Sequence, residues 1–133
     1  MSAITSIWEK YEVREQKSIM AVDNAPLMLG QLKSIITAGG YSFTSTRSGK
    51  DVLELVEMNK PDLLILRKDM PGMDGYEIAE KLNEHGYSVP MIFISSEATK
   101  ESVVKAHRAG VKDYLVQPID KETTLRKIEK QLV

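Results

Sequence analysis

The chain has 133 residues, of which 42% are hydrophobic and 28% are charged, a balance that is ordinary for a soluble globular domain. A net charge of −1 argues against a binder of nucleic acid or anionic membrane, and the absence of cysteine excludes disulfides, thiol catalysis and cysteine-ligated metals. No apolar run approaches the roughly 20 residues of a membrane span, and no secretion signal opens the chain, so we expect a cytoplasmic protein.

Residues 1–16 are predicted to form an arm that is separate from a domain at residues 17–133. Ile4, Ile7, Trp8 and Tyr11 recur at helical spacing among charged residues, which indicates an amphipathic helix. The single tryptophan favours docking on another surface. The alternative is a loosely attached extension, because chain ends are often poorly ordered.

From residue 17 onward, short apolar segments alternate with longer amphipathic ones. Five segments predict strands, at Ser18–Val22, Tyr41–Ser45, Leu63–Leu66, Met91–Ile94 and Tyr114–Val116. The third and fourth segments are continuous apolar runs, which is typical of strands covered on both faces of a sheet.

Five helices are predicted from apolar residues at helical spacing. These residues are Leu27, Leu32, Ile35 and Ile36 in the first helix, Val52, Leu53 and Val56 in the second, Tyr76, Ile78, Ala79 and Leu82 in the third, Val103, Val104 and Ala106 in the fourth, and Leu125, Ile128 and Leu132 in the fifth. Glycine or proline ends the first four helices, and Asp120 is the expected N-cap of the fifth.

This alternation predicts an α/β fold, with a doubly wound parallel sheet and helices on both faces. The natural strand order for five strands with right-handed crossovers is 2-1-3-4-5, the flavodoxin-like order. In that order a crevice opens between the carboxyl ends of the first and third strands. The residues expected there are Asp23, Asn24 and Arg67, flanked by Ser95 and Gln117.

The order and spacing of several short motifs across residues 17–133 resemble the receiver domain of response regulators, as in chemotaxis regulators. The motifs are Val22-Asp23-Asn24, Pro61-Asp62-Leu63, Met70-Pro71-Gly72-Met73-Asp74-Gly75, Ser95, and Ala109-Gly110 followed by Asp113 to Pro118. The resemblance implies a phosphorelay module, in which three carboxylates bind Mg²⁺ and one aspartate accepts a phosphoryl group while a lysine assists.

Three positions of that phosphorylation pocket depart from the family pattern. Asp23 keeps the first acidic position and Ser95 keeps the hydroxyl, but Asn24 replaces an acid, Arg67 replaces the acceptor aspartate and Gln117 replaces the lysine. The pocket charge changes from −2 to zero, so we expect weak or absent Mg²⁺ binding, no metal site and no catalytic residue. The chain is thus expected to be a degenerate receiver that is not an enzyme.

We expect Arg67 to form an ion pair with Asp23 in the space that a metal would occupy, since a guanidinium can satisfy a carboxylate and nearby carbonyls together. The alternative is that the arginine side chain swings out of the crevice into solvent. Two rival functions stay open. Asp69, two residues further on, is a candidate unusual phosphoacceptor, and Arg67 is a candidate ligand for a small anion.

The resemblance also implies a switch pair, Ser95 and Tyr114, in which the hydroxyl follows the phosphoryl group and the ring turns inward. We expect Ser95 to bond to Arg67 or to a loop amide. The alternative is a satisfied surface hydroxyl beside a half-buried tyrosine. The Gln117–Pro118 peptide bond is expected to be cis.

The fourth helix, fifth strand and fifth helix correspond to the usual contact surface of the family. Charged residues on this surface are candidates for contacting a protein partner or a second copy: Lys105, Lys112, Asp113, Arg126 and Lys127. The expected function is phosphorylation-independent signal transduction by protein–protein contact, without nucleic acid or membrane binding by this domain. An output domain beyond Val133 is a further possibility of this class.

Overall fold

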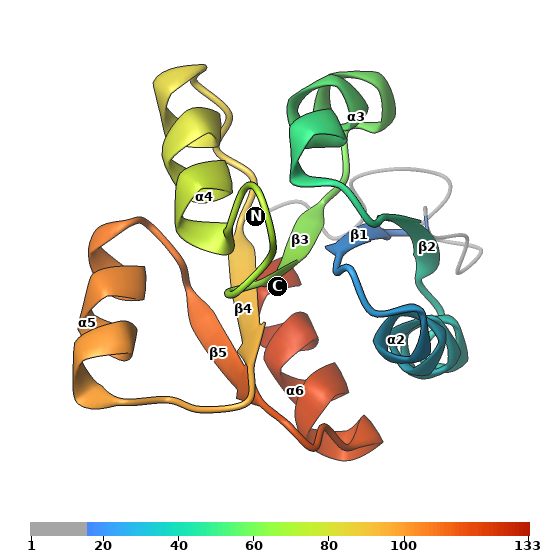
Figure 1. The fold of residues 1–133 in the computed structure, drawn as a ribbon. Coiled ribbons are helices and arrows are strands. Elements are labelled where there is room, and N and C mark those ends of the chain that lie inside the picture. The colour runs from blue at the N-terminus through green and yellow to red at the C-terminus, as the bar shows by residue number, and fades with distance from the viewer. Residues whose placement is uncertain (1–15) are drawn as a thin grey trace, which may run out of the picture.

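The computed structural model describes residues 16–133, as five strands that alternate with five helices (Figure 1). The strands are β1 Ser18–Val22, β2 Ser42–Thr46, β3 Leu63–Arg67, β4 Met91–Ser95 and β5 Asp113–Val116. The helices are α2 Pro26–Ala38, α3 Val52–Asn59, α4 Gly75–Glu84, α5 Lys100–Arg108 and α6 Lys121–Leu132, and the short 3₁₀ turn η1 Gly49–Asp51 leads into α3. The predicted arm lies outside the described residues, except for Gln16.

All strand pairs are parallel, and the order is β2-β1-β3-β4-β5, which confirms the predicted doubly wound topology. In the register of the two central strands, Val22 lies opposite Leu66. The carboxyl ends of β1 and β3 therefore meet at one edge of the sheet, and the residues that follow them are brought side by side.

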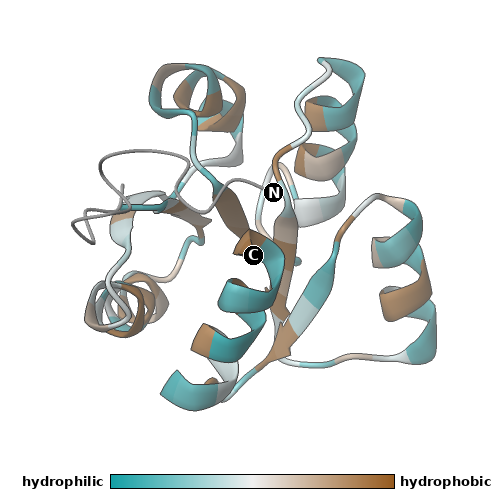
Figure 2. Cartoon of the chain, turned by 180° about the vertical axis from the view of Figure 1, so that it is seen from behind, coloured by the Kyte–Doolittle hydropathy of each residue, from teal (hydrophilic) through white to brown (hydrophobic). Residues whose placement is uncertain are grey.

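The sheet separates two hydrophobic cores. One core joins alternate strand residues to α3, α4 and α5, and the other joins the remaining strand residues to α2 and α6. Figure 2 shows brown concentrated on the central strands of the sheet, in contrast to the mixed colours of the surrounding helices. Leu63 to Leu66 are fully buried in succession, as expected for a strand covered on both faces.

Three residues that the sequence placed in buried helix stripes lie on the surface. Leu27 is 88% exposed, because it lies in the first turn of α2 beside Pro26 and the buried face of that helix runs through Met28 and Leu29 instead. Val103 and Val104 are 42% and 38% exposed, and α5 buries only Ala106. The predicted helices were correct, but these residues face solvent.

Helix ends follow local chemistry that is readable from the sequence. Asp120 caps α6, as predicted, by accepting a hydrogen bond from the Thr123 amide at 2.9 Å. Asp74 caps α4 in the same way, by accepting from the Glu77 amide at 3.0 Å. Among the residues that the structure describes, no helix has the length and apolar character required to cross a membrane.

Candidate functional site: the crevice at the carboxyl end of the sheet

Asp23 and Arg67 meet across the crevice. Arg67 is the last residue of β3, and its Nη1 lies 3.4 Å from Oδ2 of Asp23, which directly follows β1. The other carboxylate oxygen, Oδ1, accepts a hydrogen bond from the Ala25 amide at 2.8 Å. The predicted contact is therefore present, and the alternative in which Arg67 leaves the crevice is not what the structure shows.

Burial is unequal within this pair. The Asp23 side chain is fully buried, whereas the Arg67 side chain is 22% exposed. A buried carboxylate needs a charge or several hydrogen bonds to offset the loss of water. Arg67 supplies the charge from the solvent side, so the guanidinium closes the crevice over the acidic residue.

The neighbouring family positions are occupied by neutral groups. Asn24 is exposed, and its carbonyl oxygen accepts a hydrogen bond from Nη2 of Arg47 at 3.4 Å. Gln117 is partly buried, and its backbone amide donates to the Ser95 carbonyl oxygen at 2.8 Å. The peptide bond that follows Gln117 is cis, as the resemblance implied.

Ser95 is almost completely buried at the end of β4, and its Oγ accepts a hydrogen bond from the Glu97 amide at 3.3 Å. Of the two predicted partners, the loop amide is thus the one observed. Tyr114 lies on β5 and is 9% exposed, with its hydroxyl donating to Ser102 Oγ at 3.4 Å. Different groups therefore hold the two side chains of the switch pair.

The sequence analysis missed Lys68, which follows Arg67 and is only 6% exposed. Its Nζ lies 3.6 Å from Oδ2 of Asp69, whose side chain is 72% exposed. Burial by itself lowers the pKa of Lys68, but the hydroxyl of Tyr114 and the carboxylate of Asp69 outweigh it, so the pKa lies above the ordinary 10.5. Lys68 is therefore charged at neutral pH although it is buried.

Two tyrosines near Lys68, Tyr76 and Tyr114, connect the end of β3 to α5. Phe93 packs edge-on against Tyr76, with ring centroids 5.1 Å apart, and against Tyr114, at 6.1 Å. The Tyr76 hydroxyl donates to the Ser102 carbonyl oxygen at 3.1 Å. Burial and the proximity of Tyr114 raise the pKa of Tyr76, which keeps its hydroxyl protonated.

The loop from Met70 to Gly75 places the start of α4 against the end of β3. Gly72 has a φ of 85°, a conformation that glycine adopts without strain. Gly75 donates its amide to the Lys68 carbonyl oxygen at 2.9 Å, and a Cβ at Gly75 would lie 2.8 Å from the Arg67 carbonyl oxygen. This motif therefore serves the packing of the crevice edge whether or not phosphate is transferred.

The five predicted contact residues occupy α5, the start of β5 and α6. Lys127 Nζ lies 3.1 Å from Oδ1 of Asp113 and donates to the Tyr114 carbonyl oxygen, so two of the five are paired with each other. Lys105 is directed at the Tyr76 ring, with Nζ 4.1 Å from its centroid. Lys112 and Arg126 are exposed.

A doubly wound sheet in this order, with an acidic residue after β1 and a hydroxyl at the end of β4, defines a receiver-like module. The chain belongs to the response regulator receiver domain family, whose model matches residues 19–129. It is accordingly a signal transduction module of the two-component type.

The relatives include proteins of similar length and longer ones. Protein PilH of Pseudomonas aeruginosa is 28% identical over 112 residues, which cover 83% of this chain and 93% of PilH. Response regulator MprA of Mycobacterium leprae is 31% identical over 110 residues, which cover 83% of this chain and 48% of MprA, so the chain spans about half of that relative. The chemotaxis protein CheY4 of Vibrio cholerae has the same fold, with a TM-score of 0.83 at 22% identity over 89% of this chain and 100% of CheY4.

Proposed function

We propose that this receiver domain transmits a signal without accepting a phosphoryl group, by contact with other proteins. The observation that carries the proposal is Arg67 at the acceptor position, paired with buried Asp23 at 3.4 Å. A guanidinium has no oxygen that could form an acyl phosphate. The domain would then be a binding module rather than an enzyme, working in the cytoplasm.

The side chains of the crevice do not fit Mg²⁺. A hard divalent cation takes several anionic oxygens, and Asp23 is the single carboxylate at the three family positions. Both of its oxygens already accept hydrogen bonds, from the Ala25 amide and from Arg67. Among residues 16–133 there is also no group of three acidic or histidine side chains that could hold a metal. The proposed function therefore involves no metal ion.

The buried network around Lys68 supports a signalling state that is set by the chain itself. Tyr114 is buried, and its hydroxyl donates to Ser102 Oγ at 3.4 Å. Neither Tyr114 nor Lys68 needs a phosphoryl group to draw its side chain to this position. The position of β5 relative to α5 would then be fixed by sequence rather than by modification.

The surface of α5, β5 and α6, called the contact face below, is the proposed site of partner binding. It exposes Val103, Val104 and Val116 as well as the charged residues named above. Apolar side chains rimmed by charges are typical of protein contact surfaces. The occupant would be a second copy or a partner protein, and an attached output domain beyond Val133 would be another reader of the same face.

Intact-mass spectrometry after incubation with Mg²⁺ and acetyl phosphate tests the central claim. We expect no phosphoryl adduct on the full chain. A stoichiometric, base-labile adduct would contradict the proposal, and an adduct lost in Asp69→Asn would identify Asp69 as an unusual acceptor.

A rescued variant serves as the positive control for that experiment. A triple variant restores the charges of a metal-binding pocket through the changes Asn24→Asp, Arg67→Asp and Gln117→Lys. We expect the triple variant to bind Mg²⁺, detected by calorimetry, and to form the adduct. A folded triple variant without Mg²⁺ affinity would show that the backbone of the crevice has diverged as well.

A second candidate function is recognition of a small anion, because two guanidinium groups lie at the crevice. Arg67 is partly exposed, and Arg47 is hydrogen-bonded to the backbone at Asn24. Thermal-shift measurements with phosphate-bearing metabolites test this candidate. Stabilisation that disappears in Arg67→Met would favour it, and uniform absence of stabilisation would exclude it.

A further inference from the structure

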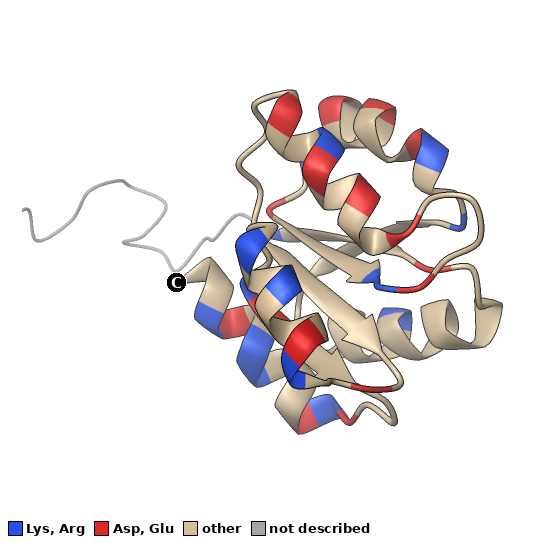
Figure 3. Ribbon diagram, turned by 60° about the vertical axis from the view of Figure 1, so that its left-hand side comes forward, with Lys and Arg blue, Asp and Glu red and all other residues tan. Residues whose placement is uncertain are grey.

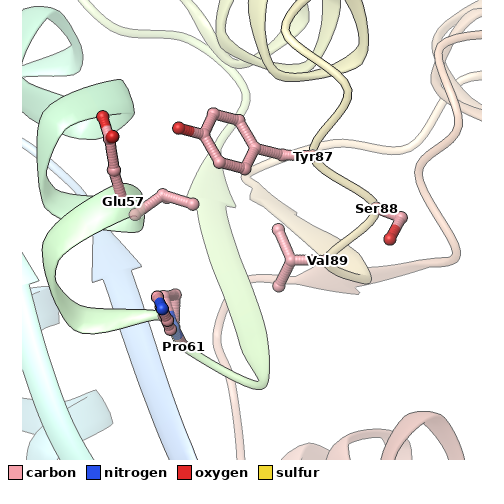
Figure 4. A pocket seen from close by; sticks show the side chains of 7 residues that line it. Glu57, Pro61, Tyr87, Ser88 and Val89 are labelled. Carbon is pink, nitrogen blue, oxygen red and sulfur yellow. The ribbon is translucent and has the colours of Figure 1, made fainter.

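A groove opens at the amino end of the sheet, on the opposite side from the crevice. Its volume is about 310 Å³, and Val56, Glu57, Lys60, Pro61, Tyr87 and Val89 line it. Figure 4 shows Glu57 on α3 and Tyr87 and Val89 on the segment before β4, on either side of β3. We call it the α3–Tyr87 groove.

The lining of the groove is mainly apolar and continuous with one of the two cores. Val56 is buried, and Tyr87 and Val89 are partly buried while packing against the core of α3, α4 and α5. Pockets for small molecules begin at roughly 300 Å³, so the groove has room for one aromatic side chain and a neighbour. Glu57 and Lys60 place opposite charges at its rim.

The chain enters the sheet close to this groove. The Ser18 amide donates to Oδ2 of Asp62 at 2.8 Å, and the Asp62 amide donates to the Ser18 carbonyl oxygen at the same distance. Asp62 directly follows Pro61, which lines the groove. Gln16 is also fastened, through a side-chain hydrogen bond to the Gly40 carbonyl oxygen at 3.1 Å. The point from which the arm leaves the domain is therefore fixed.

The arm carries a matching apolar pattern within reach. Ile4, Ile7, Trp8 and Tyr11 recur at helical spacing, with charges of both signs between them. The four residues 12–15 that precede the fastened Gln16 span up to roughly 14 Å when extended, and Ser18, two residues on, is bonded to Asp62 beside Pro61. So short a connection gives a local concentration of about millimolar, so even a weak contact would be occupied.

Other hollows in the described part of the chain are less accessible to this segment. Two of them flank β5, which the strand order separates from β1 by β3 and β4. Another lies beside Gly49 and Met73, at the crevice end of the sheet. The α3–Tyr87 groove is the one next to the point where the arm begins.

We propose that residues 4–11 dock as an amphipathic segment in the α3–Tyr87 groove of the same molecule, with Trp8 as the anchor. The occupant is thus this chain's own arm, and the docked arm covers an apolar surface that would otherwise be free for a partner. This proposal is independent of whether the crevice accepts phosphate, because the groove lies at the other end of the sheet.

The sole tryptophan of the chain makes the proposal directly measurable. We expect the full chain to show blue-shifted emission and weak acrylamide quenching, since docking removes the indole from water. Val89→Glu in the groove should shift the emission to the red and increase quenching. Leu27→Glu is the matched control, an apolar-to-acidic change at a largely exposed site on α2, and should leave both unchanged.

Ile7→Glu in the arm should have the effect of Val89→Glu without altering the folded domain, so the test survives if the groove variant unfolds. Solvent-like emission in the unmodified chain would overturn the proposal. Blue-shifted emission that persists in Ile7→Glu would also overturn it. Blue-shifted emission that disappears on dilution would assign the arm to a second copy and overturn docking within one molecule.

Discussion

In the Arg67–Asp23 pair, a partly exposed guanidinium compensates the charge of a fully buried carboxylate. Removing one partner of a buried ion pair leaves an uncompensated charge, whereas replacing both by neutral groups does not. When Arg67 is removed, the Ala25 amide still donates to Oδ1 of Asp23. The loss of stability then comes from Oδ2, which has lost its hydrogen bond and its charge partner.

We expect Arg67→Met to lower the free energy of unfolding by about 2–4 kcal/mol. The double variant Asp23→Asn/Arg67→Met should recover more than half of that loss, because no buried charge remains. Urea denaturation at neutral pH measures both. Equal losses in the single and double variants would show that packing, and not charge, is what Arg67 contributes.

Lys68 combines a buried side chain with a charge that lies 3.6 Å from Oδ2 of Asp69, and the nearby Tyr114 hydroxyl helps to raise its pKa. Lys68→Ala should destabilise the domain by about 2–3 kcal/mol, through the space that the stem leaves. Lys68→Met keeps the stem volume and should lose much less. Thermal and chemical unfolding compare the two variants. If methionine proves as damaging as alanine, the ammonium group itself is what stabilises the network.

The sequence contained a signal for Lys68 that ordinary pattern reading passes over. Side chains alternate along a strand, so residue 68 continues the side of β3 that carries Leu64 and Leu66, which face α3, α4 and α5. Tyrosines at positions 76 and 114 offer hydroxyls to a buried cation. A charged residue after an apolar strand is usually solvated, and that expectation obscured the pattern. The Asp23–Arg67 contact was predictable because strand order alone brings the two residues together.

At the scale of elements, the contact between β3 and α4 depends on the absence of a side chain at Gly75. A Cβ there would lie 2.8 Å from the Arg67 carbonyl oxygen and 3.1 Å from Lys68 Cα, both backbone atoms that cannot move aside. The helix start would have to shift away from the strand.

We expect Gly75→Ala to cost about 1–3 kcal/mol through this overpacking. Gly30→Ala is the matched control, because Gly30 lies in α2 and a Cβ added there would have nothing within 4 Å. Alanine in a helix interior is favoured over glycine by about 0.5–1 kcal/mol, so Gly30→Ala should raise the stability. Calorimetric melting of both variants checks the opposite signs.

The cap of α6 gives a pH dependence whose sign can be derived. The Thr123 amide and side chain bond to the Asp120 carboxylate and lower its pKa below 3.8. A lowered pKa in the folded state means that the carboxylate contributes stability above the unfolded pKa and loses it as the pH falls through the folded pKa. Asp120→Asn keeps a capping oxygen that does not titrate.

The difference in melting temperature between the unmodified chain and Asp120→Asn should therefore be constant near neutral pH. As the pH falls below 3.8, the melting temperature of the unmodified chain should fall relative to that of Asp120→Asn. The comparison removes the contribution of all other carboxylates. A difference that does not change with pH would show that the cap is independent of the charge.

The helices themselves were predictable, but not every face of them. Apolar spacing identified α5, yet Val103 and Val104 face solvent and only Ala106 is buried. A nine-residue helix has too few turns for spacing to distinguish a buried valine from an exposed one. Polar neighbours on both sides of Val103 and Val104 left either face available, and in the structure Ala106 is the residue that joins the core of Phe93 and Tyr114.

At the scale of the whole molecule, strand order was predictable because right-handed crossovers leave few arrangements for five parallel strands. The distribution of charge over the surface was not predictable from the sequence, because it depends on which helices become neighbours. Figure 3 shows red dominating the helices at the top, α3 and α4, while blue and red mix over α5 and α6. The contact face is therefore the less acidic side of a chain whose formal net charge is only −1.

This distribution leads to a prediction about self-association. A two-fold axis places the same surface of both copies together, so charges of both signs on one face can pair across it while a uniformly acidic face repels itself. The contact face carries exposed Lys112 and Arg126 and the Asp113–Lys127 pair, and it also exposes three valines. We expect a homodimer through this face, detectable by sedimentation equilibrium and weakened at high salt.

Val104→Asp and Val116→Asp should each shift this dimer towards monomer, because each places a charge in the apolar part of the contact face. Leu27→Asp makes the same chemical change on α2, which packs on the core beside α6 and away from α5, and should leave the association constant unaltered. Loss of dimer in Leu27→Asp alone would place the interface on the α2 side. A chain that stays monomeric at every accessible concentration would contradict the homodimer and indicate that the contact face binds a different protein. The valine variants should then weaken binding of that partner.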